Sequence, residues 1–233
     1  RWLLTRQMGG RRLRVGHAGT LDPLATGVLV VCTGRATGMI EQLQGHDKEY
    51  VAELRLGETT ASYDLEHPVD ATYPTEHITE ELVRTVLKKF TGDIMQVPPA
   101  FSACNIEGKR AYELARKGSE VRLQAKPVHI DGIEIEEMRL PDYLRLRIRC
   151  GKGTYIRSLA RDIGEALGSG AHLLSLRRTR VGGISAEQCW NMEEFEDWLE
   201  KQQIDTTPPE GQRPKHYPML TKDRTEQENQ KTT

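Results

Sequence analysis

The sequence predicts a protein of the mixed α/β class, of the α+β type, in which strands and amphipathic helices alternate along one chain. Three runs, 49–56, 128–137 and 144–150, alternate between apolar and polar residues as half-buried strands do. Two other segments, 78–92 and 156–167, carry apolar residues at helical spacing. Since only a short turn separates 128–137 from 144–150, we expect these two runs to be adjacent antiparallel strands, with helices flanking the sheet.

Length and composition indicate a soluble cytoplasmic chain that can bury a sizeable core, in one domain or two. Of its 233 residues, 37% are hydrophobic and 29% charged, and no apolar run approaches the length of a membrane span. The net charge of −1 does not by itself indicate a nucleic-acid binder. The four cysteines form no C-x-x-C pair and have no histidines at metal-ligand spacing, so we expect free thiols and no metal site.

The segment 16–27 concentrates glycines, threonines and a proline around one acid, Asp22. Because proline restricts its predecessor to extended or turn geometry, Asp22 before Pro23 has few backbone conformations. We expect the loop to hold this carboxylate rigidly, although an aspartate before proline is also a common turn former. The apolar run 28–32 that follows is interpreted as a buried strand.

Two helices are predicted in the first half of the chain. One covers 34–44 and ends before a glycine. The other begins near Ile78, where Thr79 is a candidate N-cap and the two glutamates after it favour the positive end of the helix dipole.

Local signals also place the elements of the second half. The alternation of 128–137 breaks at Gly132, which predicts a bulge. The helix over 156–167 is expected to end at Gly168. A last helix over 191–201 begins with a capping box.

Basic residues gather in three places in this nearly neutral chain, which suggests a polarised surface. For each cluster, the alternative is an ordinary solvated face. The clusters are the arginines of residues 1–16, then Arg145, Arg147 and Arg149, then Arg177, Arg178 and Arg180.

Several motifs resemble the TruB family of pseudouridine synthases, which convert a uridine in the T loop of tRNA. They are Gly-His-Ala-Gly-Thr-Leu-Asp-Pro-Leu-Ala-Thr-Gly at 16–27, Lys-Gly-Thr-Tyr-Ile-Arg at 152–157 and Gly-Ala-His-Leu-Leu-Ser-Leu-Arg-Arg-Thr at 170–179. The resemblance implies the pseudouridine synthase fold, with a largely antiparallel central sheet and the site in a cleft. It also implies one catalytic domain over 1–205, followed by a polar tail over 206–233 that we expect to be disordered.

The resemblance assigns roles to three residues: Asp22 is the nucleophile, Arg157 its charge partner, and Tyr50 stacks on the target base and is a candidate proton acceptor. A carboxylate nucleophile must be ionised, so a cation is expected beside it. A flipped uracil needs a flat apolar partner. Without the resemblance, Tyr50 would be interpreted as an inward-facing core tyrosine.

Further residues are assigned to RNA by the same resemblance. His17 braces the space that the flipped uridine leaves, while Tyr155 and Leu176 wall the uracil pocket, with ordinary core packing as the alternative for Leu176. The segment 93–118 resembles the family's RNA-gripping insertion, and we expect a short basic helix over 108–116. The candidates for phosphate contacts are Lys109, Arg110, Lys152, Arg177 and Arg178, the last three with a structural role as the alternative.

The resemblance implies tRNA as the partner, through its T loop and arm, with no cofactor, no protein partner and a monomeric enzyme. Two other functions stay open. A guide-RNA-dependent pseudouridine synthase would share the Asp22 loop but lack an insertion like 93–118, and a noncatalytic RNA-binding or RNA-folding protein could have kept the pocket. Family members carry a strand and a Lys-Pro segment before the point where this chain opens, so we expect a truncated start.

Overall fold

The computed structural model describes residues 2–7, 13–102, 105–106, 109–111 and 123–202. The chain forms two compact units, which are described separately. The first unit takes in 1–20, 28–44 and 183–233, and the second takes in 21–27 and 45–182. The loop 16–27 is therefore divided between the two units.

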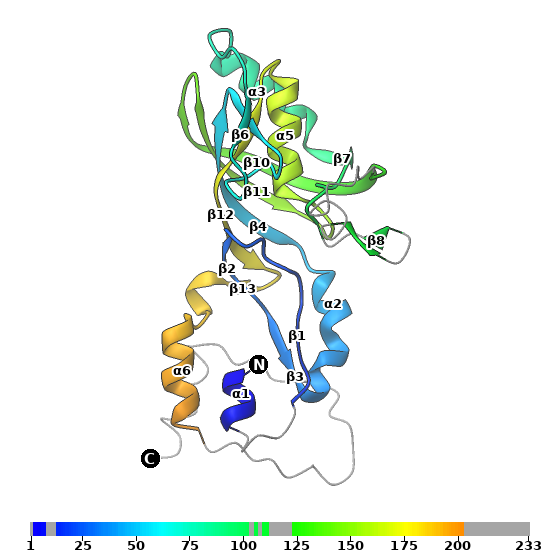
Figure 1. The fold of residues 1–233 in the computed structure, drawn as a ribbon, viewed down its shortest axis with the longest axis vertical. Helices are drawn as coiled ribbons and strands as arrows, with labels where there is room; N and C mark the ends of the chain where they lie inside the picture. Colours follow the sequence, from blue (N-terminus) through cyan, green and yellow to red (C-terminus); the bar gives the residue numbers. More distant parts are fainter. Residues whose placement is uncertain (1, 8–12, 103–104, 107–108, 112–122, 203–233) are drawn as a thin grey trace. The chain divides into compact units, whose positions relative to one another are not determined.

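The second unit is built on a sheet whose strands lie in the order β12-β4-β11-β10-β7 (Figure 1). These neighbours are antiparallel, whereas β2 pairs with β12 in parallel. The strands are β2 (Thr26–Gly27), β4 (Lys48–Leu56), β7 (Gly92–Gln96), β10 (Lys126–Arg139), β11 (Tyr143–Cys150) and β12 (Ala171–Val181). The prediction of a mixed, largely antiparallel sheet is confirmed.

The core of this unit lies on one face of the sheet. Helix α5 (Ile156–Ala166) packs against β12 and β4, and α3 (Glu80–Lys89) packs against α5 (Figure 1). The alternation predicted for β4 and β11 is confirmed, because every second residue of these strands is buried on this face. These buried residues are Tyr50, Ala52, Leu54, Leu56, Leu144, Leu146, Ile148 and Cys150.

Three local predictions for the second unit are confirmed. The side chain of Thr79 caps α3 by accepting a hydrogen bond from the backbone N–H of Leu82 at 3.2 Å. The register between β10 and β11 shifts between Ile130 and Gly132, as a bulge requires. Gly168 follows α5 with a φ of +69°, the left-handed conformation that favours glycine at a helix end.

Two short hairpins complete the unit, and one of them corrects a prediction. Strand β5 (Glu58–Thr60) pairs with β6 (Val69–Thr72), and β8 (Asn105–Ile106) pairs with β9 (Lys109–Arg110). The basic helix predicted over 108–116 is therefore wrong at Lys109 and Arg110, because pairing with β8 takes these two residues into a strand. Residues 112–116 of that helix lie outside the described residues.

The first unit contains short elements around a small core of Ala18, Cys32 and Leu43. Strand β1 (Val15–His17) pairs with β3 (Val31–Thr33), and a 3₁₀ turn (Gly34–Met39) leads into α2 (Ile40–Gln44). The helix predicted over 34–44 is thus 3₁₀ in its first half. The other elements are α1 (Trp2–Gln7), β13 (Ile184–Ser185), a 3₁₀ turn (Ala186–Gln188) and α6 (Met192–Glu200).

Helix α6 begins as predicted, with the capping box of Asn191 and Glu194. The buried strand predicted at 28–32 is wrong, since only its end belongs to β3, and Leu29 and Val31 are 41% and 51% exposed. In the two-stranded pair of β1 and β3 only one face is covered, so Cys32 is buried while its neighbour Val31 points away. The predicted tail over 206–233 lies outside the described residues. No helix in the described part of the chain is long and apolar enough to cross a membrane.

Candidate active site

Asp22 and Arg157 form a bidentate ion pair within the second unit, although they are 135 residues apart in the sequence. Arg157 lies in the first turn of α5 and donates from Nη2 to Asp22 Oδ1 at 2.6 Å and from Nε to Asp22 Oδ2 at 3.0 Å. The Arg157 side chain is 2% exposed and that of Asp22 is 30% exposed. This fork fixes both the position and the plane of the carboxylate, so a buried cation presents a surface-accessible acid.

The remaining donors of Arg157 are directed at backbone carbonyls from two other segments. Nη1 donates to the carbonyl of Ser62 at 3.2 Å, and Nη2 donates to the carbonyl of Phe101 at 2.9 Å. A buried guanidinium must satisfy its N–H groups inside the protein. These contacts leave the side chain little freedom to move away from Asp22.

A second carboxylate, Asp64, lies near the same Nε of Arg157 that donates to Asp22, and no site role was predicted for it from the sequence. Its Oδ2 is 3.7 Å from Arg157 Nε, and its side chain is 6% exposed. Asp64 Oδ1 accepts from the hydroxyl of Ser62 at 2.5 Å and from the backbone N–H of Glu66 at 3.0 Å. A serine two residues before an aspartate in a polar loop is the only local signal in the sequence that indicates such a turn.

The start of α5 is fixed by the end of β7. The side chain of Gln96, which is 1% exposed, accepts from the backbone N–H of Tyr155 at 2.8 Å and donates to the Tyr155 carbonyl at 3.1 Å. The hydroxyl of Ser158 donates to the carbonyl of Val97 at 2.8 Å. Because Arg157 lies between these two contacts, the position of its backbone is set by β7.

The Asp22 segment is anchored to the sheet at its far end. The backbone N–H of Ala25 donates to the Asp22 carbonyl at 2.9 Å and closes a turn, after which β2 pairs with Arg177 and Arg178 of β12. Gly27 has a φ of +99°, and a Cβ on it would lie 2.1 Å from the carbonyl oxygen of Arg178. Only glycine allows this approach, so the segment is short and held at both ends.

Tyr50 lies on β4 between β12 and β11, and its side chain is part of the core face. Burial raises the pKa of its phenol, and the negative charge of Asp22 adds to the rise, while the Arg178 guanidinium opposes it by charge and by a hydrogen bond to the hydroxyl. Cys150 also raises the pKa, and Tyr50 is therefore a neutral phenol at pH 7. Arg178 is 1% exposed, which favours the structural alternative for this arginine over a phosphate contact.

A small pocket lies beside the ion pair and is lined by three charged residues, one serine and six apolar residues. Of the two predicted pocket walls, Leu176 lines it, whereas Tyr155 is not one of its described lining residues. The residues that line it are Asp22, Leu24, Ala25, Asp64, Leu65, Arg157, Leu173, Leu174, Ser175 and Leu176. A partly exposed carboxylate that is held by a buried cation and bordered by apolar residues is suited to nucleophilic or acid–base chemistry.

The other predicted RNA contacts lie at the surface or outside this pocket. Lys152 and Arg177 are exposed in the second unit, and His17 is exposed on β1 of the first unit. Lys109 and Arg110 belong to β9. Their predicted contacts with RNA stay predictions.

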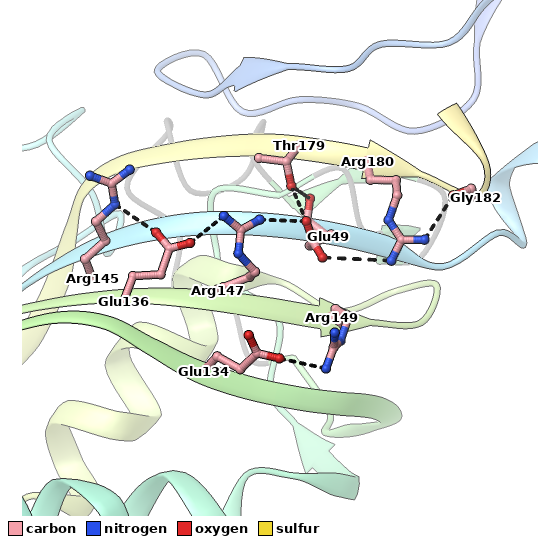
Figure 2. Close-up of polar contacts among 9 residues, drawn as sticks. All are labelled: Glu49, Glu134, Glu136, Arg145, Arg147, Arg149, Thr179, Arg180 and Gly182. Carbon is pink, nitrogen blue, oxygen red and sulfur yellow. Dashed lines mark hydrogen bonds and ion pairs between the residues drawn. The ribbon is translucent and has the colours of Figure 1, made fainter. Parts of the chain in front are cut away.

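The arginine cluster of β11 differs from the polarised surface that the sequence suggested. Arg147 contacts Glu49 and Glu136, Arg145 contacts Glu136, and Arg149 contacts Glu134, as Figure 2 shows. Cross-strand pairing places a carboxylate beside each guanidinium. This face of the sheet therefore carries balanced charge and no excess of positive charge at these three arginines.

Comparison with known proteins identifies the family. Residues 6–156 match the N-terminal domain of the TruB family pseudouridylate synthases, and residues 157–216 match the C-terminal domain of tRNA pseudouridylate synthase B. The tRNA pseudouridine synthase B of Bacteroides thetaiotaomicron is 62% identical over 208 residues, which are 88% of this chain and 87% of that protein. The chain belongs to the TruB family of pseudouridine synthases, enzymes that isomerise uridine.

More distant relatives show the same family. The tRNA pseudouridine synthase B of Flavobacterium johnsoniae is 46% identical over 86% of this chain and 87% of its own length. Among solved structures, a chain of a Cbf5-Nop10-Gar1 complex superposes with a TM-score of 0.62 at 30% identity, over 84% of this chain and 49% of that one. A chain of an H/ACA RNP bound to a substrate RNA superposes with a TM-score of 0.58 at 29% identity. This chain spans about half the length of both solved chains (47–49%).

Proposed function

We propose that this chain converts the T-loop uridine of tRNA to pseudouridine, with Asp22 as the essential acid. The observation that carries the proposal is the bidentate contact from buried Arg157, which holds a partly exposed Asp22 carboxylate among apolar residues. The curated relatives, at up to 62% identity, are named tRNA pseudouridine synthase B. Those relatives favour a tRNA enzyme over a guide-RNA-dependent one.

The reaction must break the N1–C1′ bond, turn the uracil and join C5 to C1′. The C5 proton is lost and N1 regains a proton, so the product is an isomer and no cofactor is needed. In the proposed mechanism the Asp22 carboxylate attacks the base or the sugar, or removes a sugar proton. The bidentate pair with Arg157 supports a role for Asp22 as the ionised carboxylate, because both of its oxygens accept hydrogen bonds from the guanidinium.

The target base must leave the RNA stack to reach this acid. We propose that Tyr50 stacks on the flipped uracil and is the candidate acceptor of the C5 proton. Its ring lies on the core face of β4, and the charge of Asp22 is one of the causes that raise the pKa of its phenol. Stacking on an aromatic ring stabilises a base by about 1–3 kcal/mol, which offsets part of the unstacking cost.

We further propose that both compact units act as one catalytic domain and that RNA is held by residues of each. His17 of the first unit braces the space left by the base, and Lys109 and Arg110 of the insertion contact the tRNA backbone. The family match over 6–156 runs through both units, which supports a single functional domain.

The decisive experiment incubates the chain with an unmodified tRNA transcript and maps pseudouridine, comparing Asp22→Asn with the parent. We expect Asp22→Asn to form none at the T loop while still binding tRNA. Asp162→Asn is the matched control, because Asp162 also pairs with an arginine of α5, Arg161, at 2.6 Å. Full modification by Asp22→Asn would refute the nucleophile assignment, and tight binding without modification by the parent would support the RNA-binding alternative.

The contribution of the insertion is tested by salt dependence. Replacing both Lys109 and Arg110 with alanine should weaken tRNA binding and lower the slope of log K against log salt by about 1–2, since each phosphate contact releases counterions. The control replaces Lys88 and Lys89, exposed at the end of α3, in the same way. An unchanged slope in the Lys109 and Arg110 variant would remove β9 from the RNA interface.

A further inference from the structure

Strand β12 has a bulge at Thr179, next to Arg178, which pairs with β2 of the Asp22 segment. Arg178 pairs with Tyr50 of β4 and Arg180 pairs with Glu49, so Thr179 is an extra residue in the register. In a regular strand Arg178 and Arg180 would share one face. The bulge instead lets Arg178 point to the core face with Tyr50, where it is 1% exposed, while Arg180 points to the opposite face with Glu49.

Hydrogen bonds between Thr179 and Glu49 hold this bulge from the face opposite the core (Figure 2). Thr179 Oγ1 lies 2.9 Å from Glu49 Oε1 and 3.2 Å from the Glu49 carbonyl oxygen, and its single proton can be donated to either. The Glu49 carboxylate also accepts from Arg147 of β11 at 2.8 Å and lies 3.9 Å from Arg180. One carboxylate therefore joins β4, β11 and β12 at the bulge.

The Glu49 carboxylate is partly buried, which strengthens the hydrogen bonds that it accepts from Thr179 and Arg147. Its side chain is 14% exposed, so protein donors replace much of its water. Burial raises its pKa, but the hydrogen bonds from Thr179 and Arg147 outweigh burial and leave the pKa below its ordinary value. The lowered pKa keeps the carboxylate ionised and paired at neutral pH.

The same stretch of both strands carries Tyr50 and its partner Arg178, both on the core face of the sheet. Tyr50 follows Glu49 in β4, and Arg178 precedes Thr179 in β12, with the Arg178 guanidinium bonded to the Tyr50 hydroxyl. A one-residue slip of a strand moves its side chains to the other face. Any loosening at Thr179 would therefore move Arg178, and the Tyr50 ring would lose a fixed partner.

We propose that Thr179 and Glu49 are positioning residues, which fix the β12 bulge from the outer face of the sheet and so hold Arg178 against Tyr50 and orient the Tyr50 ring. This rests on the proposed function through the role of Tyr50 in stacking on the base. Both residues act through Arg178 and Tyr50, because their side chains lie on the face opposite the core.

The test compares Thr179→Val, which keeps the shape and removes the donor, with Thr179→Ser, which keeps the hydroxyl. Glu134→Gln is the control, since Glu134 pairs with Arg149 at 2.8 Å on the same face, away from the bulge. We expect Thr179→Val to lower the single-turnover rate of pseudouridine formation about tenfold with tRNA affinity unchanged, and Thr179→Ser and Glu134→Gln to stay within about twofold of the parent. Glu49→Gln, which keeps an acceptor for Thr179, should show a smaller loss of rate and serves if Thr179→Val does not fold.

A second measurement follows the Tyr50 ring itself by NMR of protein labelled with ¹³C-tyrosine, with Tyr50→Phe to assign the signal. The signal should move in Thr179→Val and stay in place in Thr179→Ser and Glu134→Gln. An unmoved Tyr50 signal, an equal loss of rate in Glu134→Gln, or a loss confined to tRNA affinity would each overturn the proposal. If Asp22→Asn is as active as the parent, the proposed function fails, whereas the NMR comparison still decides the positioning role.

Discussion

Replacing Arg157 with lysine separates the charge of this residue from its geometry. Arg157 donates four hydrogen bonds: two to Asp22 and one each to the carbonyls of Ser62 and Phe101. A single ammonium keeps the charge but cannot reproduce the planar fork, so about two of these bonds are lost. At about 1.5 kcal/mol for each hydrogen bond to a charged group, the free energy of unfolding should fall by about 3 kcal/mol.

The effect of Arg157→Lys on catalysis should be similar in size to its effect on folding, because a 100-fold loss of rate corresponds to about 2.7 kcal/mol. Misplacement of a reacting group by about 1 Å can cost about 100-fold in rate, and we expect a loss of that order in single-turnover pseudouridine formation. Unfolding in urea measures the stability. Arg161→Lys is the comparison variant, since Arg161 lies one turn further along α5 and forms a similar fork with Asp162, at 2.6 and 2.8 Å. Arg161 also donates to the Tyr63 hydroxyl and the Val97 carbonyl, and none of these bonds involves Asp22.

Comparing the two variants tests whether the Arg157 fork positions Asp22. Arg161→Lys should lose stability while keeping its rate within about twofold of the parent. If Arg157→Lys reacts at the parent's rate, the fork does not position Asp22. If Arg161→Lys slows the reaction as much as Arg157→Lys does, the loss comes from α5 as a whole and the ion pair has no special role.

Three other predictions follow from the described contacts. Asp64→Asn should lower the free energy of unfolding by about 1–3 kcal/mol and slow the reaction, because buried donors lose a charged acceptor. Urea unfolding measures the stability and a single-turnover assay measures the rate. A variant with the parent's stability and rate would contradict this prediction. The hydrogen bond from His129 to Asp93, at 2.6 Å, raises the pKa of His129. The pair therefore stabilises the fold fully below the ordinary histidine pKa of about 6.5. This contribution to the free energy of unfolding is lost as the pH rises through the raised pKa. An NMR titration should show the His129 pKa falling in Asp93→Asn, and no change would refute the assignment. Burial raises the pKa of Cys150 to about 12, so iodoacetamide at pH 8 should label this thiol only after unfolding in urea, as mass spectrometry of its peptide would report.

Elements with strong local signals could be predicted from the sequence, and those that depend on tertiary cover could not. Helices α3 and α6 begin at their predicted caps, and the alternation of β11 placed its buried face correctly. An apolar run carries no information on how many of its faces will be covered, so 28–32 was assigned to a buried strand although Leu29 and Val31 are exposed. Helical spacing likewise could not reveal that β8 would pair with Lys109 and Arg110.

The site was predicted only in part, because most of its contacts are also tertiary and leave no local signal in the sequence. The sequence alone supported a rigid acid at Asp22, while its partner Arg157 came from the family resemblance, because nothing local links residues this far apart. Asp64 sits in a polar loop and could not be told from a surface acid. Arg178 stands between two exposed arginines, and only the bulge at Thr179, which breaks the alternation, turns it into the core.

The separation of Asp22 from Arg157 also bears on when this protein becomes an enzyme. Asp22 precedes every strand of the second unit's sheet, Arg157 follows β11, and β12, which anchors the Asp22 segment through β2, comes later still. Contacts of such high sequence separation form late, since the intervening chain must order first. During synthesis the acid therefore emerges long before the cation that holds it, and no nascent chain that stops short of β12 carries a complete site. If Asp22 has the role proposed above, turnover of uridine requires the sheet to be complete through β12.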